Sequence, residues 1–427
     1  MKWNNSILAI GLGLIVSQAG HATNGYFSHG YGVKSQAMGG VGIALPQDSL
    51  AAATNPAGMG LIGDRFDLGL VLFRPHRDAT LENTAGGTGA LDGSFSGNGR
   101  ENFIIPEGGY NHVLSQEFTL GVSVYGNGGM NTDYEQPIGL LSGATGNESG
   151  IDYMQLFVAP TVTWKPFINH TLGLSLNLGY QRFKAKGIDN FAAISTDPTS
   201  VTGVGADDAF GIGVHVGWIG QFSDTFTMGL SYQSRTNFGR FDKYRGLFAD
   251  EGAMDAPANF GVGIALNVTP EFTLALDVKR ILFSDVPAVG NTISLWNGQP
   301  FIDGGAGNLG DKNGPGFGWD NSTVIKIGLS YDYSDTLTLR AGYNHNQQPI
   351  PDTEALFNVL APGVIQDHMT FGFTWTMSSG GEISASYTHA FKDGVNGSDA
   401  VPAQFGGGNV GIEMHQNIFG IAYGAKF

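Results

Sequence analysis

The chain has no cysteine, and only 14% of its 427 residues are charged. Without cysteine it can form neither disulfides nor thiolate metal sites. No run of eighteen apolar residues occurs after the N-terminal stretch, which excludes membrane-spanning helices. Acidic residues outnumber basic ones, with a formal net charge of −16, so no nucleic-acid partner is expected.

Sequence motifs of enzymes are also missing. The ten histidines show no metal-ligand spacing. The 67 glycines form neither a phosphate-binding loop before a helix nor a Gly-x-Ser-x-Gly elbow. We therefore expect no metal, no cofactor, no catalytic residue and no enzymatic activity.

Strict alternation of apolar and small polar residues recurs along the chain, for example over 118–124, 226–232 and 371–375. A period of two places the apolar residues on one face of a strand and Gly, Ser, Thr or Asn on the other. A soluble sandwich would bury the apolar face in a core. Here the polar face consists of unusually small groups, and long Gly-rich loops follow every second strand. This combination favours a barrel with lipid outside and a partly polar lumen inside.

The alternation predicts an all-β fold, a fourteen-stranded antiparallel transmembrane β-barrel. Its connections alternate between short turns and long loops, as expected for periplasmic and extracellular ends. Tryptophans next to short turns and tyrosines next to long loops predict two aromatic belts at the membrane interfaces. The expected strands are 64–74, 103–112, 118–126, 152–165, 170–183, 207–221, 225–235, 257–268, 271–281, 322–333, 335–346, 366–377, 381–391 and 413–427.

The two ends of the chain carry targeting signals. Residues 1–22 have the composition of a secretory signal peptide, with Lys2, an apolar stretch over 7–16 and a small-x-small cleavage site over 20–22. Alternation continues to the last residue, Phe427, and resembles the signal that bacterial barrel-assembly machinery recognises. An ordinary C-terminal strand is the alternative.

Residues 23–63 do not fit the hairpin pattern. They carry little charge and many apolar residues, which argues against a disordered tail. A fourteen-stranded barrel is too wide for its own side chains to fill, so we expect this segment to plug the lumen. The expected division is therefore a signal peptide at 1–22, a plug (hatch) at 23–63 and the barrel with its long loops at 64–427.

The plug segment contains Gly-Gly-Val-Gly-Ile-Ala over 39–44 and Ala-Ala-Ala-Thr-Asn-Pro-Ala-Gly-Met over 51–59. Together with the strand count, these motifs resemble the outer-membrane long-chain fatty acid transporter family, which includes relatives for aromatic hydrocarbons. The resemblance implies passive uptake: loops capture a hydrophobic ligand, the plug rearranges, and a kink in the third strand releases the ligand sideways into the membrane. The glycines over 126–129 would permit such a kink, although they equally fit the start of a loop.

The candidate site residues fall into three sets. Asn55, Pro56 and Ala57 form the expected gating motif of the plug, with a plain helix terminator as the alternative. Inward parity makes four cations candidate contacts for a ligand head group, although pairing with Asp277, other acids or the plug is the more ordinary role for each. These four are Arg235, Lys279, Lys326 and Arg340. An apolar capture patch is expected at Leu247, Phe248, Leu356, Phe357, Val359 and Leu360.

These observations lead to one expected function and several alternatives. We expect a monomeric channel in the outer membrane of a Gram-negative cell, in contact with membrane lipid, lipopolysaccharide and the barrel-assembly machinery. It would take up hydrophobic molecules, with long-chain fatty acids favoured over aromatic hydrocarbons or phenolics. A hydrolase, a general porin and an adhesin are the remaining alternatives.

Overall fold

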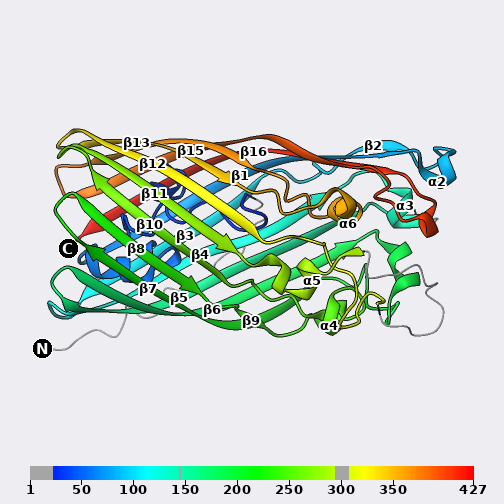
Figure 1. Ribbon diagram of the computed structural model, residues 1–427, viewed down its shortest axis with the longest axis horizontal. Helices are drawn as coiled ribbons and strands as arrows, with labels where there is room; N and C mark the ends of the chain where they lie inside the picture. The colour runs from blue at the N-terminus through cyan, green and yellow to red at the C-terminus, as the bar shows by residue number, and fades with distance from the viewer. Residues whose placement is uncertain (1–22, 144–145, 294–306) are drawn as a thin grey trace, which may run out of the picture.

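The computed structural model describes residues 23–143, 146–293 and 307–427, so the expected signal peptide lies outside the described residues. Fourteen long strands of this part pair into one antiparallel sheet, and the sheet closes because its first and last strands pair (Figure 1). They are β1 Arg65–Glu82, β3 Phe103–Val113, β4 Phe118–Asp133, β5 Gly150–Phe167, β6 His170–Lys186, β7 Asp207–Gln221, β8 Phe226–Gln233, β10 Asn259–Asn267, β11 Phe272–Ile281, β12 Ser322–Ser334, β13 Leu337–Asn346, β14 Asp367–Thr376, β15 Gly381–Gly397 and β16 Asn409–Lys426.

The predicted fourteen-stranded barrel is therefore confirmed, with differences at the strand ends. β1 continues eight residues beyond its expected end, and β4 continues seven. The apolar alternation fades there because the outward positions are polar, as His76 and Asp78 are on β1. Two short strands without a membrane-facing side escaped prediction. They are β2 Gly93–Ser96, which pairs with β1, and β9 Asn237–Phe238, which pairs with β7.

The helices are short and lie in the loops or in residues 23–63. No helix among the described residues is long and apolar enough to cross a membrane. The α-helices are α1 Val33–Gln36, α2 Thr84–Gly87, α3 Gly139–Ser142, α4 Ala249–Gly252, α5 Pro287–Gly290 and α6 Ala355–Asn358. The 3₁₀ helices are η1 Ala51–Ala53, η2 Pro56–Leu61, η4 Asp189–Ile194, η5 Asp242–Tyr244, η6 Phe283–Asp285, η8 Asp352–Glu354 and η9 Ala403–Phe405.

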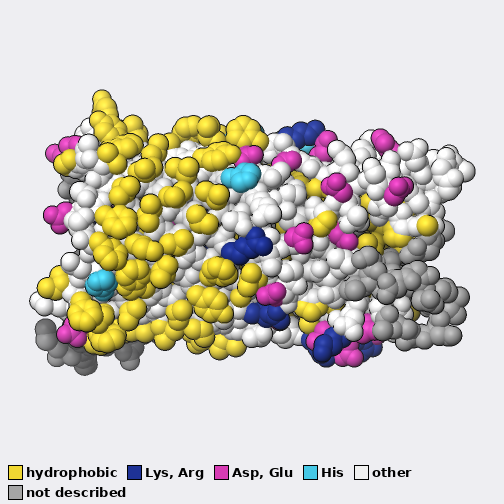
Figure 2. Space-filling model, viewed as in Figure 1, with side chains coloured by type: hydrophobic (Ala, Val, Ile, Leu, Met, Phe, Trp, Pro, Cys, Tyr) yellow, Lys and Arg dark blue, Asp and Glu magenta, His cyan; other side chains and the backbone are white. Residues whose placement is uncertain are grey.

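The outer wall is apolar over the half of the barrel that ends in short turns (Figure 2). On β6 the outward side chains of Leu172, Leu174, Leu176 and Leu178 are 39–48% exposed, whereas the residues between them face inward and are buried. Exposed Trp164 and Trp375 lie near short turns, and exposed Tyr232, Tyr343 and Tyr387 lie near long loops. Lipid therefore replaces a protein core as the apolar environment of this face.

Residues 23–63, which we call the luminal segment, run inside the cylinder of strands (Figure 1, blue). Inward glycines make room for its backbone. A Cβ atom at Gly217 of β7 would lie 1.8 Å from Asn55 Oδ1, and one at Gly173 of β6 would lie 2.2 Å from the Ala57 nitrogen. The small inward residues of the alternating pattern thus allow a folded chain, rather than bulky side chains, to occupy the lumen.

A charge on the apolar outer face should destabilise the barrel according to its depth. We expect Leu176→Arg, at the middle of the outward leucine column, to lower the free energy of unfolding by about 2–4 kcal/mol. Leu172→Arg is the matched control, because Leu172 lies beside Trp164 and Trp218 at the membrane interface, where the cost should be about 0–1 kcal/mol. Denaturant titration in phospholipid vesicles measures both, and equal losses would contradict the assigned depth.

Candidate functional site

The extracellular loops enclose an apolar pocket, which we call the loop pocket. Its lining residues come from β5, β6 and four loops between strands and include no charged side chain among the described residues. The cavity measures only about 40 Å³, well below the roughly 300–1,000 Å³ of ligand sites, so a ligand would have to displace side chains. It is lined by Ile151, Phe183, Phe191, Leu247, Phe248, Ala288, Leu309, Pro315, Gly316, Phe317, Phe357 and Leu360.

The expected capture patch lies at this pocket. Leu247, Phe248, Phe357 and Leu360 line it directly. The other two members, Leu356 on α6 and Val359 just after it, are buried in the same large apolar cluster, which also contains residues of the luminal segment. The loops therefore pack against one another and against the luminal segment, and together they form one continuous apolar core.

Aromatic rings connect the loop pocket to the luminal segment. Phe248 contacts Phe183 with ring centroids 4.6 Å apart, Phe183 contacts Tyr153 at 6.4 Å, and Tyr153 contacts Tyr26 at 5.9 Å. Tyr26 also contacts Phe27 at 5.0 Å. We call these five residues the aromatic path. Edge-to-face ring contacts of this kind form a continuous apolar connection from the outer end of the barrel to the start of the luminal segment.

The sequence analysis missed the middle of this path. Tyr153 and Phe183 occupy inward positions near the outer ends of β5 and β6, where the inward residues closer to the turns are small and polar, such as Thr163 and Ser175. In the sequence, the only sign of this path was a large aromatic residue at an inward-facing position of each strand. Their mutual contact depends on the cross-strand pairing of Tyr153 with Phe183, which requires the register of the two strands.

The barrel wall is not fully bonded between β3 and β4. The two strands pair only from Gly108 with Val124 to Val113 with Thr119, so Phe103–Glu107 bonds to β1 alone. We call this unpaired stretch the seam. Beyond it Asn127 forms a bulge in the pairing of β4 with β5, within the run of glycines where the sequence suggested a kink.

The luminal segment completes the backbone bonding of β4 beside the seam. The Gly129 N–H donates to the Tyr26 carbonyl at 2.9 Å, and the Ser28 N–H donates to the Asn127 carbonyl at 3.3 Å. Phe27 and Gly128 form an isolated antiparallel bridge. The inner end of the aromatic path therefore lies against the one part of the described wall where neighbouring barrel strands separate.

Side chains fill the seam from the lumen outwards. Arg77 on β1 is fully buried and donates to the Asn131 carbonyl at 2.8 Å and to the Arg100 carbonyl at 2.5 Å. Its guanidinium carbon and that of Arg100 lie 6.0 and 5.1 Å from the ring centre of Phe103. Two cations around one aromatic ring thus take the place of a strand-to-strand ladder.

Wall side chains hold the luminal segment by its backbone. The Asp277 carboxylate accepts from the Gly42 and Ile43 N–H groups at 2.8 and 3.0 Å. Lys326 donates to the His29 and Gly40 carbonyls at 2.8 and 3.0 Å. Such charge-assisted bonds to buried backbone are stronger than neutral ones, so they fix the segment to β11 and β12.

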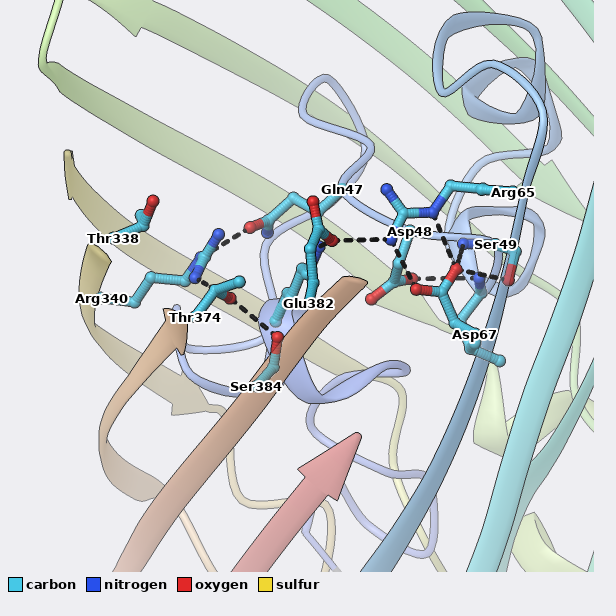
Figure 3. A network of polar contacts seen from close by, with 12 residues as sticks. Gln47, Asp48, Ser49, Arg65, Asp67, Thr338, Arg340, Thr374, Glu382 and Ser384 are labelled. Atoms are coloured by element: carbon cyan, nitrogen blue, oxygen red, sulfur yellow. Dashed lines mark hydrogen bonds and ion pairs between the residues drawn. The ribbon is translucent and has the colours of Figure 1, made fainter. Parts of the chain in front are cut away.

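A second polar network holds the segment near the short turns (Figure 3). Arg65 pairs with Asp67 at 2.5 Å and with Glu382 at 3.1 Å, and Glu382 also pairs with Lys34 of α1 at 2.5 Å. Burial raises the pKa of the Asp48 carboxyl to about 6; Asp67 acts in the same direction, whereas Lys34 and Arg65 lower it.

None of the four candidate head-group cations lines the loop pocket, and Lys279 and Lys326 border one small cavity together with Asp277. Lys326 binds the luminal segment, as described above, and Arg340 donates to Gln47 of that segment at 2.9 Å (Figure 3). Arg235 follows β8 and donates to the Asp285 carbonyl. Lys279 differs from these three: its ammonium lies 5.7 Å from the ring centre of Phe27, and it makes no hydrogen bond or ion pair within the described residues.

The Asn55-Pro56-Ala57 motif joins the luminal segment to the wall. Asn55 caps η2 by accepting from the Ala57 N–H at 3.1 Å. Its amide nitrogen donates to the Ile43 carbonyl at 2.7 Å and to the Trp218 carbonyl of β7 at 3.2 Å. Pro56 begins η2, where its missing N–H costs nothing.

Comparison with known proteins places this architecture in a family. Residues 14–427 match the model of a family described as "Outer membrane protein transport protein (OMPP1/FadL/TodX)". Among curated proteins, an uncharacterised Chlorobium limicola protein, encoded in the 5′ region of a phosphoenolpyruvate carboxykinase gene, is 38% identical over 71 residues. That match covers 16% of this chain and 35% of the relative.

Solved structures share the fold at low sequence identity. The Pseudomonas putida toluene transporter TodX is 18% identical with a TM-score of 0.67, over 95% of this chain and all of that one. A Pseudomonas aeruginosa FadL homologue is 16% identical with a TM-score of 0.69, over 94% of this chain and all of that one. The Ralstonia pickettii toluene transporter TbuX is 18% identical with a TM-score of 0.63, over 93% and 99%. At this identity the likeness shows the fold alone.

Bulk added to the inner wall should displace the luminal segment. In Gly217→Val the new side chain would overlap Asn55, which should weaken docking of the segment by about 1–3 kcal/mol. We expect liposomes that contain the variant to swell faster in sucrose than those with the unaltered chain. Gly220→Val adds the same bulk to the outer face of β7, beside Trp218, and should not change swelling. Equal swelling of both variants would contradict an occluding role for the segment.

Proposed function

The chain belongs to the outer-membrane transport protein family, whose members are passive channels for hydrophobic compounds and not enzymes, and from this premise we propose that it takes up long-chain fatty acids. The loop pocket and the aromatic path would accept the hydrocarbon chain, since both are apolar. Lys279 would receive the carboxylate. The single observation that carries this choice is that the Lys279 ammonium, at the inner end of the path, makes no ion pair or hydrogen bond within the described residues, although Asp277 borders the same small cavity.

The absence of an ion pair at Lys279 is informative because of the cost of removing charged groups from water. A carboxylate moved out of water needs a charged or hydrogen-bonding partner, and a buried ammonium needs one equally. Lys279 lies against Phe27, the last ring of the path, so a ligand that follows the rings would bring its head group to this ammonium. A fatty acid would thus place its hydrocarbon chain among the apolar residues and its carboxylate beside Lys279.

Aromatic hydrocarbons are the second candidate. The described lining of the loop pocket has no charged side chain, and the route beyond it consists of aromatic rings. Rings of a small aromatic ligand could stack edge-to-face along it without any head-group partner. Two of the structural relatives described above, TodX and TbuX, are toluene transporters.

The proposed route has three steps. The ligand first displaces side chains of the loop pocket, then moves along the aromatic path to Tyr26. The luminal segment acts as the plug: movement of Tyr26–Ser28 would free the bonds to β4 and open the seam toward the membrane. Asn55 would remain as an anchor during this movement, because it holds the far part of the segment to β7.

The C-terminal residue has a proposed role in assembly of the barrel. Phe427 would serve as the recognition residue for barrel assembly. Its N–H donates to the Asp64 carbonyl at 3.2 Å, and its ring stacks on Tyr110 at 5.6 Å, at the closure of the barrel. A monomeric state stays a prediction.

A substitution of Lys279 can distinguish uptake of fatty acids from uptake of aromatic hydrocarbons. We expect Lys279→Met to lower oleate uptake about tenfold, because a charge-assisted hydrogen bond contributes about 1.5–3 kcal/mol. Toluene uptake should be unaffected if toluene enters at all. Uptake of both radiolabelled compounds by cells that depend on this channel is the measurement, with Lys392→Met, an exposed site pairing with Glu413, as control. Unchanged oleate uptake in Lys279→Met would exclude the proposed head-group contact.

Lateral release can be tested at the bulge of β4. Deletion of Asn127 should restore regular pairing with β5, draw β4 toward β3 and abolish most uptake. Deletion of Tyr333, at the bulge between β12 and β13, is the matched control and should leave uptake intact. If both deletions transport normally while the barrel migrates as a folded species on gels, the seam is not the exit.

A further inference from the structure

The outward face of β6 changes character along its length. From the short turn upward its outward side chains are four leucines, then Tyr180, then Arg182, Lys184 and Lys186. Because alternate residues share a face, these three cations form one column directly above the apolar band and its tyrosine. The column therefore lies at the level of the polar head groups of the outer leaflet.

This clustering is unusual for the chain. Only 21 of its 427 residues are lysine or arginine, and the net charge is −16. β1 carries one outward cation above its apolar residues, Arg74, followed by His76 and Asp78. Three consecutive outward cations on one strand stand out against this acidic background.

The acidic groups around the column do not occupy all of the hydrogen-bond donors of its three cations. Lys186 pairs with Asp133 at 2.7 Å and with Glu148 at 2.9 Å. Arg182 makes a loose contact with Asp208, at 3.9 Å, and a side-chain hydrogen bond with Tyr180. Lys184 makes no ion pair with any described residue. The guanidinium of Arg182 and the ammonium of Lys184 can therefore still donate to an anion from outside.

A polar cavity lies beside Lys184, and Arg182 borders a smaller hollow next to the same lysine. The polar cavity measures about 150 Å³ and is lined by Arg100, Asp152, Lys184 and Lys186, among others. Arg100 is oriented by its ion pair with Asp152 at 3.1 Å. This volume, unlike that of the loop pocket, admits a phosphate group without displacement of side chains, since a water molecule occupies about 30 Å³ in the liquid.

We propose that this face binds the phosphate groups of lipid A, the membrane anchor of lipopolysaccharide in the outer leaflet. Arg182 and Lys184 bind one phosphate through charge-assisted hydrogen bonds, and the acyl chains lie against the leucine column below. The nearby carboxylates of Asp133, Glu148, Asp152 and Asp208 hold the cations in place and limit the site to ligands with strong negative charge. The proposal depends on the outer-membrane location and is independent of the transport route.

The test uses the purified full-length barrel in a neutral detergent. The probes are hexa-acylated lipid A with two phosphates, the same lipid A after removal of both phosphates, and sodium phosphate. Native mass spectrometry gives the dissociation constants. We expect the double variant Arg182→Gln/Lys184→Gln to bind the phosphorylated lipid about tenfold or more weakly than the unaltered chain, and Lys184→Arg to bind it normally. Arg74→Gln, an outward cation on β1, should also bind normally.

Three results would overturn the proposal. They are equal binding of phosphorylated lipid A by the double variant and by Arg74→Gln, equal binding of the phosphorylated and dephosphorylated lipids, and binding of sodium phosphate as tight as that of the lipid. Heat-dependent migration on gels establishes that each variant contains the folded barrel, so a loss of binding cannot be confused with a loss of structure.

Discussion

Within a membrane, every backbone N–H and C=O group must find a partner inside the protein, since lipid offers none. Pairing of neighbouring strands meets most of this requirement in the described barrel, but at the seam β3 and β4 separate. Beside the seam the luminal segment bonds to the backbone of β4, through Tyr26 to Gly129 and through Ser28 to Asn127. The same residues that occupy the lumen thus complete the wall, which links the position of the segment to the state of the seam.

This linkage gives the segment two different kinds of attachment. Its middle is held by charged wall residues such as Asp277 and Lys326, and removal of either would leave a buried partner unsatisfied. Its beginning is held by backbone bonds and aromatic contacts, which individually contribute less. On the proposed route, a ligand would meet the weaker attachment first. The distribution of contacts therefore favours movement of the first few residues over expulsion of the whole segment.

A single strand of the wall contacts two different environments, the filled lumen on one face and the membrane on the other. The inward side of β6 contacts the luminal segment through Gly173, while its outward leucines meet lipid and three outward cations follow them along the strand. Each environment selects a residue type at the same period of two. Small residues inside, aliphatic residues outside and charges above the membrane are separate consequences of one backbone geometry.

Sequence alone determined the barrel. The period-two alternation, the aromatic belts and the loop lengths gave fourteen strands and their orientation, because lipid imposes the same rule on every strand. The strand ends of β1 and β4 were misplaced where that rule stops at the membrane surface. Only the tertiary structure decided the site. Strand register brings Tyr153 to Phe183, and the fold of the luminal segment places Lys279 beside Phe27 while Lys326 is used to bind backbone. These contacts join residues far apart in the chain, so no local pattern could separate one lysine from the other.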